Sequence, residues 1–341
     1  MSEITTIGLD IAKNVFHVML CDSRGKVAKK RMLKRNEVLA FFARLGPCLI
    51  GMEACASAHY WARQLTALGH EVKLVPPQYV KAYLRGNKND YNDALAISEA
   101  VTRPQMRFVA IKTPEQQDLQ ALHRLRERSV KMRTALCNQI RALAGEYGLV
   151  CAKGVATLRR QIPRWLEDSE NGLSDFFRRL LSRSYQQLQA LDEDIDFYTR
   201  ELKRYSQQDD ACQRLQTIPG FGPIVASAFH SHVGHGEAYR RGRDVSASIG
   251  LVPRQHSSGG KDTLLGISKR GNGQLRSLLV HGARAVVSRA EKKDDPLSRW
   301  INKIRAERGV NKATVALANK LARIGWAVLA HNTVYKAEAR A

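Results

Sequence analysis

The chain of 341 residues is long enough for two or three domains with a sizeable buried core. Its 55 Lys and Arg residues outnumber 32 Asp and Glu residues, and the net charge of +23 predicts a polyanionic partner rather than a surface that is basic only for solubility. No apolar stretch is long enough to span a membrane, no signal peptide precedes the first strand, and the six cysteines include no C-x-x-C pair, so we expect a cytoplasmic protein with reduced thiols and no zinc site.

The first 110 residues alternate between strand and helix patterns. Strand-like runs rich in apolar residues fall at 4–10, 15–20, 26–32, 48–53 and 72–75. Helical periodicity predicts helices at 36–45, at 57–68 and from residue 90 onward, and a hairpin turn is expected over 22–25. Three strands followed by alternating helices and strands predict an α/β domain over residues 1–110, built on a mixed sheet.

Four acidic residues fall at the ends of these elements. Asp10 ends the first strand and Glu53 ends the fourth, and strands in those positions are neighbours in ribonuclease-H-like sheets. Asp90 and Asp93 are three residues apart in the first turn of a helix, so their carboxylates share one face; taken alone, they are ordinary helix-capping aspartates. If all four acids meet at one sheet edge, they ionise together only when cations neutralise them.

A cluster of four carboxylates has a particular chemistry. Oxygen-only ligands suit Mg²⁺, or else Mn²⁺, rather than zinc. Two such ions about 3.5–4 Å apart hold the attacking and leaving oxygens of a phosphodiester. Each acid by itself is a weak sign, but the four together predict a metal-dependent site for cutting nucleic acid.

Residues 111–210 predict two long helices. The first begins at Pro114, a favoured first-turn residue, and runs to about residue 147. Its apolar face consists of Leu119, Leu122, Leu125, Met132, Leu136, Ile140 and Leu143. After a broken stretch around residues 154–172, the second helix repeats apolar residues in a three–four alternation from Leu188 to Tyr205, which is a heptad seam. We expect a coiled-coil arm whose seam is equally compatible with packing inside the chain and with contact between subunits.

The last third of the chain is its most basic part. Residues 211–341 hold 22 basic and 8 acidic side chains, so we expect a mainly helical domain over 211–335 to supply the main nucleic-acid contacts. The run 215–226 resembles a helix-hairpin-helix, in which Gly220 and Gly222 let backbone N–H groups approach a phosphate; a plain helix–helix turn is the alternative. Three histidines follow without a cysteine or carboxylate pattern that would support a metal site: His230, His232 and His235. We expect surface or phosphate-contacting roles for them.

A polar, glycine-rich stretch follows at 255–261. Ser258 precedes two glycines there, so its hydroxyl is unhindered. Basic residues expected to hold phosphates are Arg254, Lys261, Lys269, Arg270 and Arg276, together with Lys88 beside the paired aspartates. On chemistry alone, a flexible phosphate-binding loop with an ordinary serine is the better interpretation.

Taken in order, these motifs resemble the insertion-sequence-110 (IS110) family of transposases, the DEDD recombinases, over nearly the whole chain. The resemblance is carried by residues 8–13, 52–55, 88–94, 218–222, 250–259 and 268–272. The form of residues 257–261 is similar to that of the IS1111 branch. Two departures are visible: Asn89 stands where threonine is common, and Ala56 stands where glycine often follows the Glu-Ala-Cys run.

The resemblance implies roles that the residues alone do not give. It implies a RuvC-like, ribonuclease-H-fold catalytic domain that binds Mg²⁺ through Asp10, Glu53, Asp90 and Asp93. It implies that Ser258 is the nucleophile and forms a covalent phosphoserine link to DNA. Members of this family pair double-stranded donor and target DNA through an element-encoded guide (bridge) RNA and assemble as tetramers, so a homo-oligomer between dimer and tetramer is expected.

We therefore expect an RNA-guided, Mg²⁺-dependent DNA transposase or recombinase of an insertion sequence, associated with a bacterial nucleoid. A Holliday-junction resolvase or metal-dependent nuclease is the nearest alternative, because it would use the same four acids with water as the nucleophile. The other alternative is a non-catalytic nucleic-acid-binding protein whose acids are structural. A resolvase or nuclease would not need Ser258, whereas the transposase would. A non-catalytic protein would bind DNA without metal-dependent strand cleavage.

Overall fold

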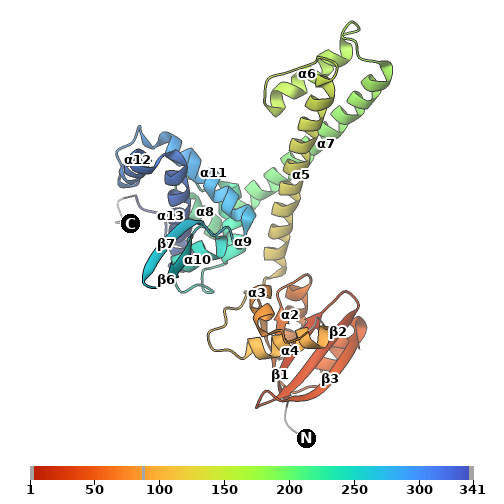
Figure 1. Ribbon diagram of the computed structural model, residues 1–341, viewed down its shortest axis with the longest axis vertical. Helices are drawn as coiled ribbons and strands as arrows, with labels where there is room; N and C mark the ends of the chain where they lie inside the picture. The colour runs from red at the N-terminus through yellow and green to blue at the C-terminus, as the bar shows by residue number, and fades with distance from the viewer. Residues whose placement is uncertain (1–3, 87–88, 338–341) are drawn as a thin grey trace. The chain divides into compact units, whose positions relative to one another are not determined.

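The computed structural model describes residues 4–86 and 89–337, so the predicted contact residue Lys88 lies outside the described residues. The chain forms two compact units that divide between Glu115 and Gln116 (Figure 1). The elements of the first unit are β1 (Ile4–Ile11), β2 (Val15–Asp22), β3 (Val27–Lys34), η1 (Arg35–Glu37), α1 (Val38–Phe42), β4 (Leu49–Glu53), α2 (Ala58–Ala67), β5 (Glu71–Val75), α3 (Pro77–Val80), η2 (Lys81–Tyr83) and α4 (Asp90–Val101). Those that follow are α5 (Pro114–Gly145), α6 (Val155–Glu167), α7 (Asp175–Gln208), α8 (Asp210–Gln216), α9 (Pro223–Val233), α10 (Gly242–Ile249), β6 (Pro253–Ser258), β7 (Lys261–Ile267), α11 (Gly273–Ala290), α12 (Pro296–Arg308) and α13 (Val310–Ala330). No helix among the described residues is long and apolar enough to cross a membrane.

The first unit is built on a five-stranded mixed sheet with the strand order β3-β2-β1-β4-β5. β1 and β3 both pair antiparallel with β2, as short hairpin connections allow, whereas β4 pairs parallel with β1 and β5 across helical connections. The mixed sheet predicted from the sequence is confirmed, and so is the adjacency of the first and fourth strands. The parallel pair brings the carboxyl ends of β1 and β4 to one edge of the sheet.

Side-chain alternation along β1 separates two layers of helices. Ile7, Leu9 and Ile11 belong to the apolar cluster that includes Trp61 of α2 and Val38 of α1. Gly8 faces the other way, and a Cβ atom built there would lie only 1.9 Å from the carbonyl oxygen of Ala94 in α4. The absence of a side chain at this position therefore lets α4 lie directly on β1.

The helix expected over 36–45 is much shorter than predicted. It consists of the 3-10 turn η1 and the five residues of α1. A turn over residues 43–45 follows α1, and Gly46 and Pro47 then prevent the helix from resuming. The short α3 and the 3-10 turn η2, between Pro77 and Tyr83, were not expected. Val80 of α3 is buried in the apolar cluster beside α4.

The long helices α5 and α7 pack together with α6 near their far ends (Figure 1). The prediction of a broken stretch over 154–172 is wrong, because residues 155–167 form α6 with Pro163 inside the helix. Leu158, Ile162 and Trp165 recur at helical spacing and are buried, and this packing offsets the hydrogen bond that proline cannot make. Arg178 of α7 then caps α6 by donating to the carbonyl oxygens of Trp165, Leu166 and Asp168.

The heptad seam of α7 is buried within the chain. Leu188, Leu191, Ile195 and Leu202 are all at most 7% exposed. Two side-chain pairs join α5 to α7 alongside the seam, Arg133 to Asp192 at 2.8 Å and Arg126 to Thr199 at 2.8 Å. Of the two interpretations of the seam, the structure favours packing inside the chain.

The apolar face predicted for α5 is misplaced in part. Leu125, Met132 and Leu143 are 43%, 39% and 46% exposed. The buried face of α5 includes the polar residues His123 and Ser129 instead. Nε2 of His123 forms a hydrogen bond with the hydroxyl of Ser227 in α9 at 3.0 Å. Hydrophobic periodicity alone does not predict that this polar residue is buried.

In the last third, helices α8 to α13 share one apolar cluster, in which α9, α11 and α13 supply many of the buried side chains. The stretch 255–261, expected to be a flexible loop, is instead part of the β6–β7 hairpin. Gly259 and Gly260 both have positive φ angles (+55° and +76°), as a tight two-residue hairpin turn requires. The hairpin carries almost no buried side chain, so its position is set by the backbone rather than by the core.

Because the seam is internal, charging it should destabilise the arm rather than dissociate an oligomer. We expect Leu191→Lys with Ile195→Lys to lower the free energy of unfolding by roughly 2–5 kcal/mol per site, since each change buries an ammonium group in place of an apolar contact. Thermal unfolding followed by circular dichroism measures this, with light scattering on the same samples. Phe197→Lys, at a position of α7 that is 51% exposed, is the matched control and should change little. A folded double variant of reduced mass would show that the seam joins subunits.

Candidate acidic active site

Three elements of the first unit bring the predicted acids together. Asp10 is the penultimate residue of β1, and Glu53 is the last residue of β4. Asp90 and Asp93 lie in the first turn of α4, which Asn89 caps by accepting a hydrogen bond from the backbone N–H of Tyr91 at 2.9 Å. Since Gly8 holds α4 against β1, the start of this helix lies beside the end of the strand.

The distances between the acids suit a metal ion. Asp10, Asp90 and Asp93 each offer a carboxylate oxygen, and the three oxygens lie within 4.8 Å of one another. Glu53 is outside this closest set, but its charge acts on Asp10, and the charge of Asp93 acts on Glu53. All four predicted acids therefore belong to one electrostatic group, and the closest three have the oxygen-only donor set that Mg²⁺ prefers.

The acids disturb one another's ionisation. Burial, followed by the charges of Asp93, Asp90 and Glu53, raises the pKa of Asp10 to about 6 from its ordinary value of 3.8. Burial and then the charge of Asp93 raise the pKa of Glu53. A divalent cation bound among these carboxylates would relieve the repulsion between them and favour their charged forms.

His17 is a neighbour of the acids that the sequence analysis missed. Its Nδ1 atom lies 3.5 Å from Oδ2 of Asp90, and it opposes the rise in the pKa of Asp10. The signal was present in the hairpin, because the antiparallel register of β1 and β2 pairs residue 10 with residue 17. Its side chain is 13% exposed, so it lies at the inner wall of the acidic group.

Ser258 belongs to the second unit, at the end of β6. Within the described part of the chain its hydroxyl has no hydrogen-bond partner, and the residue is exposed. Ser257 differs, because its hydroxyl donates to Oδ1 of Asp262 at 2.6 Å. Of the two adjacent serines, Ser258 is the one whose hydroxyl is available.

The predicted phosphate contacts have different surroundings. Arg254, Lys261, Lys269 and Arg270 are exposed on and beside the β6–β7 hairpin. The guanidinium of Arg276, by contrast, donates to the carbonyl oxygens of Ile249 and Arg270 at 2.7 and 2.9 Å, so it holds the turn before α11. These assignments stay predictions.

The two glycines of the predicted helix-hairpin-helix also have structural roles. Gly220 has a φ of +87°, and a Cβ atom there would lie 2.9 Å from the carbonyl oxygen of Gly282 in α11. Gly222 precedes Pro223 as the N-cap residue of α9. Helix, turn and helix are present at 210–233, and a phosphate contact at the turn stays a prediction.

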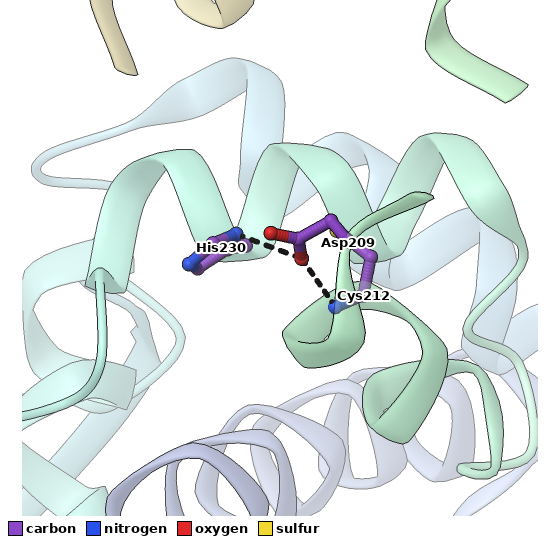
Figure 2. A group of neighbouring side chains, drawn as sticks. All are labelled: Asp209, Cys212 and His230. Carbon is purple, nitrogen blue, oxygen red and sulfur yellow. Dashed lines mark hydrogen bonds and ion pairs between the residues drawn. The ribbon is translucent and has the colours of Figure 1, made fainter. Parts of the chain in front are cut away.

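His230 lies in a polar cluster that the sequence analysis did not foresee. Figure 2 shows Asp209 between His230 and the backbone of Cys212. Oδ1 of Asp209 accepts from the N–H of Cys212 at 2.7 Å and lies 3.3 Å from Nδ1 of His230. His230 is buried, so the expectation of a surface role for it is wrong. Its carboxylate partner is Asp209, three residues before Cys212.

This cluster fixes the start of α8 to α9. Burial works against ionisation of Asp209, but the hydrogen bonds from His230 and Cys212 outweigh it and hold the pKa of Asp209 well below its usual range. Burial and then the charge of Asp209 raise the pKa of the Cys212 thiol, which keeps it protonated. The carboxylate is thus already used as a helix cap and an ion-pair partner. His232 has a separate contact, 3.2 Å from the hydroxyl of Ser248.

Comparisons with known proteins cover both units. Residues 7–148 match the IS110 DEDD transposase model, and residues 212–297 match the model of the transposase IS116/IS110/IS902 family. A probable family 20 transposase of Pseudomonas aeruginosa is 46% identical over 98% of this chain and 99% of its own length. The transposase for insertion sequence element IS1111A of Coxiella burnetii is 46% identical over 98% and 92%, and that for IS1328 of Yersinia enterocolitica is 42% identical over 98% and 99%.

The raised pKa of Asp10 predicts how the stability of the metal-free protein depends on pH. The folded state binds this proton more tightly than the unfolded chain, so stability falls as the pH rises from about 4 to above 6. We expect Asp10→Asn to raise the thermal midpoint in EDTA at pH 7.5 and to leave it unchanged at pH 4. Mg²⁺ should stabilise the wild type and stabilise the variant less.

Thermal unfolding across this pH range, with EDTA and then with Mg²⁺, makes the measurement. Glu71→Gln, an exposed acid of β5 in the same unit, is the control and should show neither effect. An Asp10→Asn variant that is less stable than the wild type in EDTA at pH 7.5 would contradict the electrostatic account of the site.

Proposed function

This chain belongs to the IS116/IS110/IS902 family of transposases, in its IS1111 branch, and on that basis we propose that it cuts and rejoins DNA through a divalent metal site and a covalent link to Ser258. The observation that carries the proposal is the convergence of three carboxylate oxygens, from Asp10, Asp90 and Asp93, within 4.8 Å. Glu53 completes the group electrostatically. The function of an insertion-sequence transposase supplies the phosphodiester on which such a group acts.

The acids fit Mg²⁺, or Mn²⁺, on two grounds. Their donor atoms are oxygens only, and burial together with the charges of the other acids raises the pKa of Asp10. Asp10, Glu53, Asp90 and Asp93 would hold the ions. When bound, divalent ions stabilise negative charge on phosphodiester oxygens and favour the alkoxide form of a nucleophile.

The proposed step is a transesterification. The Oγ atom of Ser258 forms a bond to phosphorus while the bond from phosphorus to one DNA oxygen breaks. The serine hydroxyl loses its proton, and the departing DNA oxygen gains one. One phosphodiester replaces another, so the reverse step, with a new DNA hydroxyl as the nucleophile, rejoins strands without an external energy source.

The hairpin prepares Ser258 for this role. Its hydroxyl is exposed and free of local hydrogen bonds, whereas that of Ser257 is held by Asp262. The Gly259–Gly260 turn places no side chain beside it, so a phosphate has room to approach. Four exposed cations lie along and after the hairpin and are proposed to hold the DNA backbone: Arg254, Lys261, Lys269 and Arg270.

We also propose an element-encoded guide RNA and a homo-oligomer, from dimer to tetramer, as partners. The family resemblance and the net charge of +14 in residues 211–341 support a large nucleic-acid footprint. The α7 seam is already filled by the chain itself, so subunit contacts would use other surfaces. A division of the chain after residue 110 into an arm (111–210) and a serine domain (211–335) is part of the same proposal.

The adjacent serines allow a sharp test. We expect Ser258→Ala to bind DNA but to form no covalent protein–DNA adduct, because the attacking oxygen is gone. Ser257→Ala should keep adduct formation, since it removes only the exposed hydrogen bond to Asp262. Denaturing gels after reaction in Mg²⁺, with mass spectrometry of the adduct peptide, make the measurement. Cleaved DNA without any adduct would falsify the serine mechanism and point to the water-using nucleases.

The acidic group has its own test. We expect Asp90→Asn to lower the cleavage rate by about 10²–10⁴-fold, the equivalent of a few kcal/mol of charge stabilisation, while DNA binding persists. Asp90 is 59% exposed, so its removal should not disturb the fold. Glu71→Gln again serves as the control. Full activity of Asp90→Asn in Mg²⁺ would remove Asp90 from the site, and binding without any cleavage by the wild type would favour the non-catalytic alternative.

A further inference from the structure

The first unit has an open pocket of about 690 Å³ that the acidic group does not use. Its lining residues come from the β1–β2 turn, from the end of β3 with η1 and α1, and from the start of α2: Asn14, Val15, Lys34, Arg35, Asn36, Leu39, Tyr60 and Trp61. Two of them are basic, two are aromatic and none is acidic. The volume falls in the range of sites that hold a small molecule or a single nucleotide.

The pocket lies at the same edge of the sheet as the acids. Asn14 follows the end of β1, which carries Asp10, and α2 follows the end of β4, which carries Glu53. β1, β3 and β4 all point the same way, so Lys34 at the end of β3 is at this edge too. A nucleic-acid strand bound at the acids would therefore share this edge of the sheet with the pocket.

The pocket and the acids occupy opposite faces of that edge. Trp61 packs edge-on against Phe16 at 4.9 Å, in the cluster that holds Ile7 and Leu9. Asp10 projects to the other face, where α4 begins, as the alternation from Gly8 requires. A strand that places a phosphodiester at the acids would reach the pocket only by crossing the edge, which a paired and stacked base cannot do.

The aromatic and basic groups of the pocket form a connected set. The ring of Tyr60, on a residue that is 41% exposed, meets Trp61 edge-on at 5.1 Å. The guanidinium of Arg35 lies 5.0 Å from the centre of the Trp61 ring and donates to the carbonyl oxygen of Lys13 at 3.2 Å, which holds it in place. Lys34 is exposed beside it. An aromatic surface next to two cations is the arrangement that binds unpaired nucleotides, with the base stacked and the phosphate neutralised.

Trp61 adds an independent observation. The residue is only 3% exposed, and its indole Nε1–H has no hydrogen-bond acceptor among the described residues. A buried donor without a partner lowers stability, and buried tryptophan usually finds an acceptor. Trp61 therefore lines the pocket with its ring, while its Nε1–H is enclosed and has no acceptor among the described residues.

We propose that this pocket binds one unpaired nucleotide of a nucleic-acid strand that reaches the acidic group. The proposal rests on the proposed function for the strand and its direction, and it adds a site that the cutting chemistry does not require. The nucleotide leaves its stack, lays its base against Tyr60 and places its phosphate near Lys34 and Arg35. DNA and RNA share this chemistry, so the source of the nucleotide is a question for the test.

Binding of single-stranded oligonucleotides by the full-length protein in EDTA tests the pocket without cleavage. We expect Tyr60→Ala to weaken binding by roughly 5- to 150-fold, the measured range for loss of one stacked base. Tyr60→Phe should bind within about twofold of the wild type, because stacking needs the ring and not the hydroxyl. Tyr79→Ala, another half-exposed tyrosine of the same unit outside the pocket, is the control and should have no effect.

A second measurement locates the nucleotide. Oligonucleotides carrying 4-thiothymidine or 4-thiouridine are irradiated with the wild type in EDTA, and we expect cross-linked peptides that contain Tyr60 or Trp61. Binding is measured with DNA and with RNA oligonucleotides to identify the source of the nucleotide. Weaker binding of DNA by Tyr60→Ala would indicate a displaced DNA strand, and weaker binding of RNA would indicate an unpaired RNA nucleotide.

The outcome is separable from that of the proposed function. Wild-type affinity of Tyr60→Ala in both arms, with cross-links elsewhere, would overturn the pocket while leaving the Ser258 adduct untouched. Absence of the adduct together with cross-links at Tyr60 would leave the pocket in place and remove the serine mechanism. Because Tyr60 is partly exposed, its substitution should preserve the fold, which circular dichroism checks.

Discussion

The constraint that shapes the first unit is the convergence of four mutually repelling carboxylates at one sheet edge. The parallel pairing of β1 with β4 brings Asp10 and Glu53 to the same edge. Gly8 then allows α4 to lie on β1 so closely that Asp90 and Asp93 join them. Burial, and then the charges of the other three acids, raises the pKa of Asp10. The fold holds these charges together through the apolar packing of α4 against the sheet, and a cation would relieve the repulsion between the carboxylates.

The parts of the fold that the sequence predicted well are those with strong local patterns. The strands of the sheet, the hairpin turn and the Asn89-capped helix all follow from local residue choice, and they carry the four acids to their places. The adjacency of the first and fourth strands needed the resemblance to a known fold. The nucleophilic role proposed for Ser258 also rests on resemblance, because an exposed serine in a hairpin has no sequence pattern that distinguishes it from Ser257.

The errors arose where partners distant in sequence decide the structure. Helix α6 forms around Pro163 because Leu158, Ile162 and Trp165 find a core, and Arg178 caps its end. The buried face of α5 includes His123 because Ser227, more than a hundred residues away, supplies a hydrogen bond. His230 is buried for the same reason, with Asp209 as its partner. Polar residues that are paired inside a protein look like surface residues in a sequence.

The internal seam of the arm has a consequence for synthesis of the chain. Ile140 on α5 is covered in part by Leu188 and Leu191, and Leu188 comes 43 residues after the end of α5 at Gly145. At about 5–20 residues per second, roughly 2–9 s pass before the ribosome adds Leu188 to the cluster that covers α5. A gene copy truncated before residue 188 lacks this part of the cluster, although α6 and the start of α7 remain. Such a fragment would expose the apolar side chains that pack against Leu188 and Leu191 in the full chain. Truncated copies of the gene should therefore yield products that aggregate or are degraded rather than products that compete for DNA.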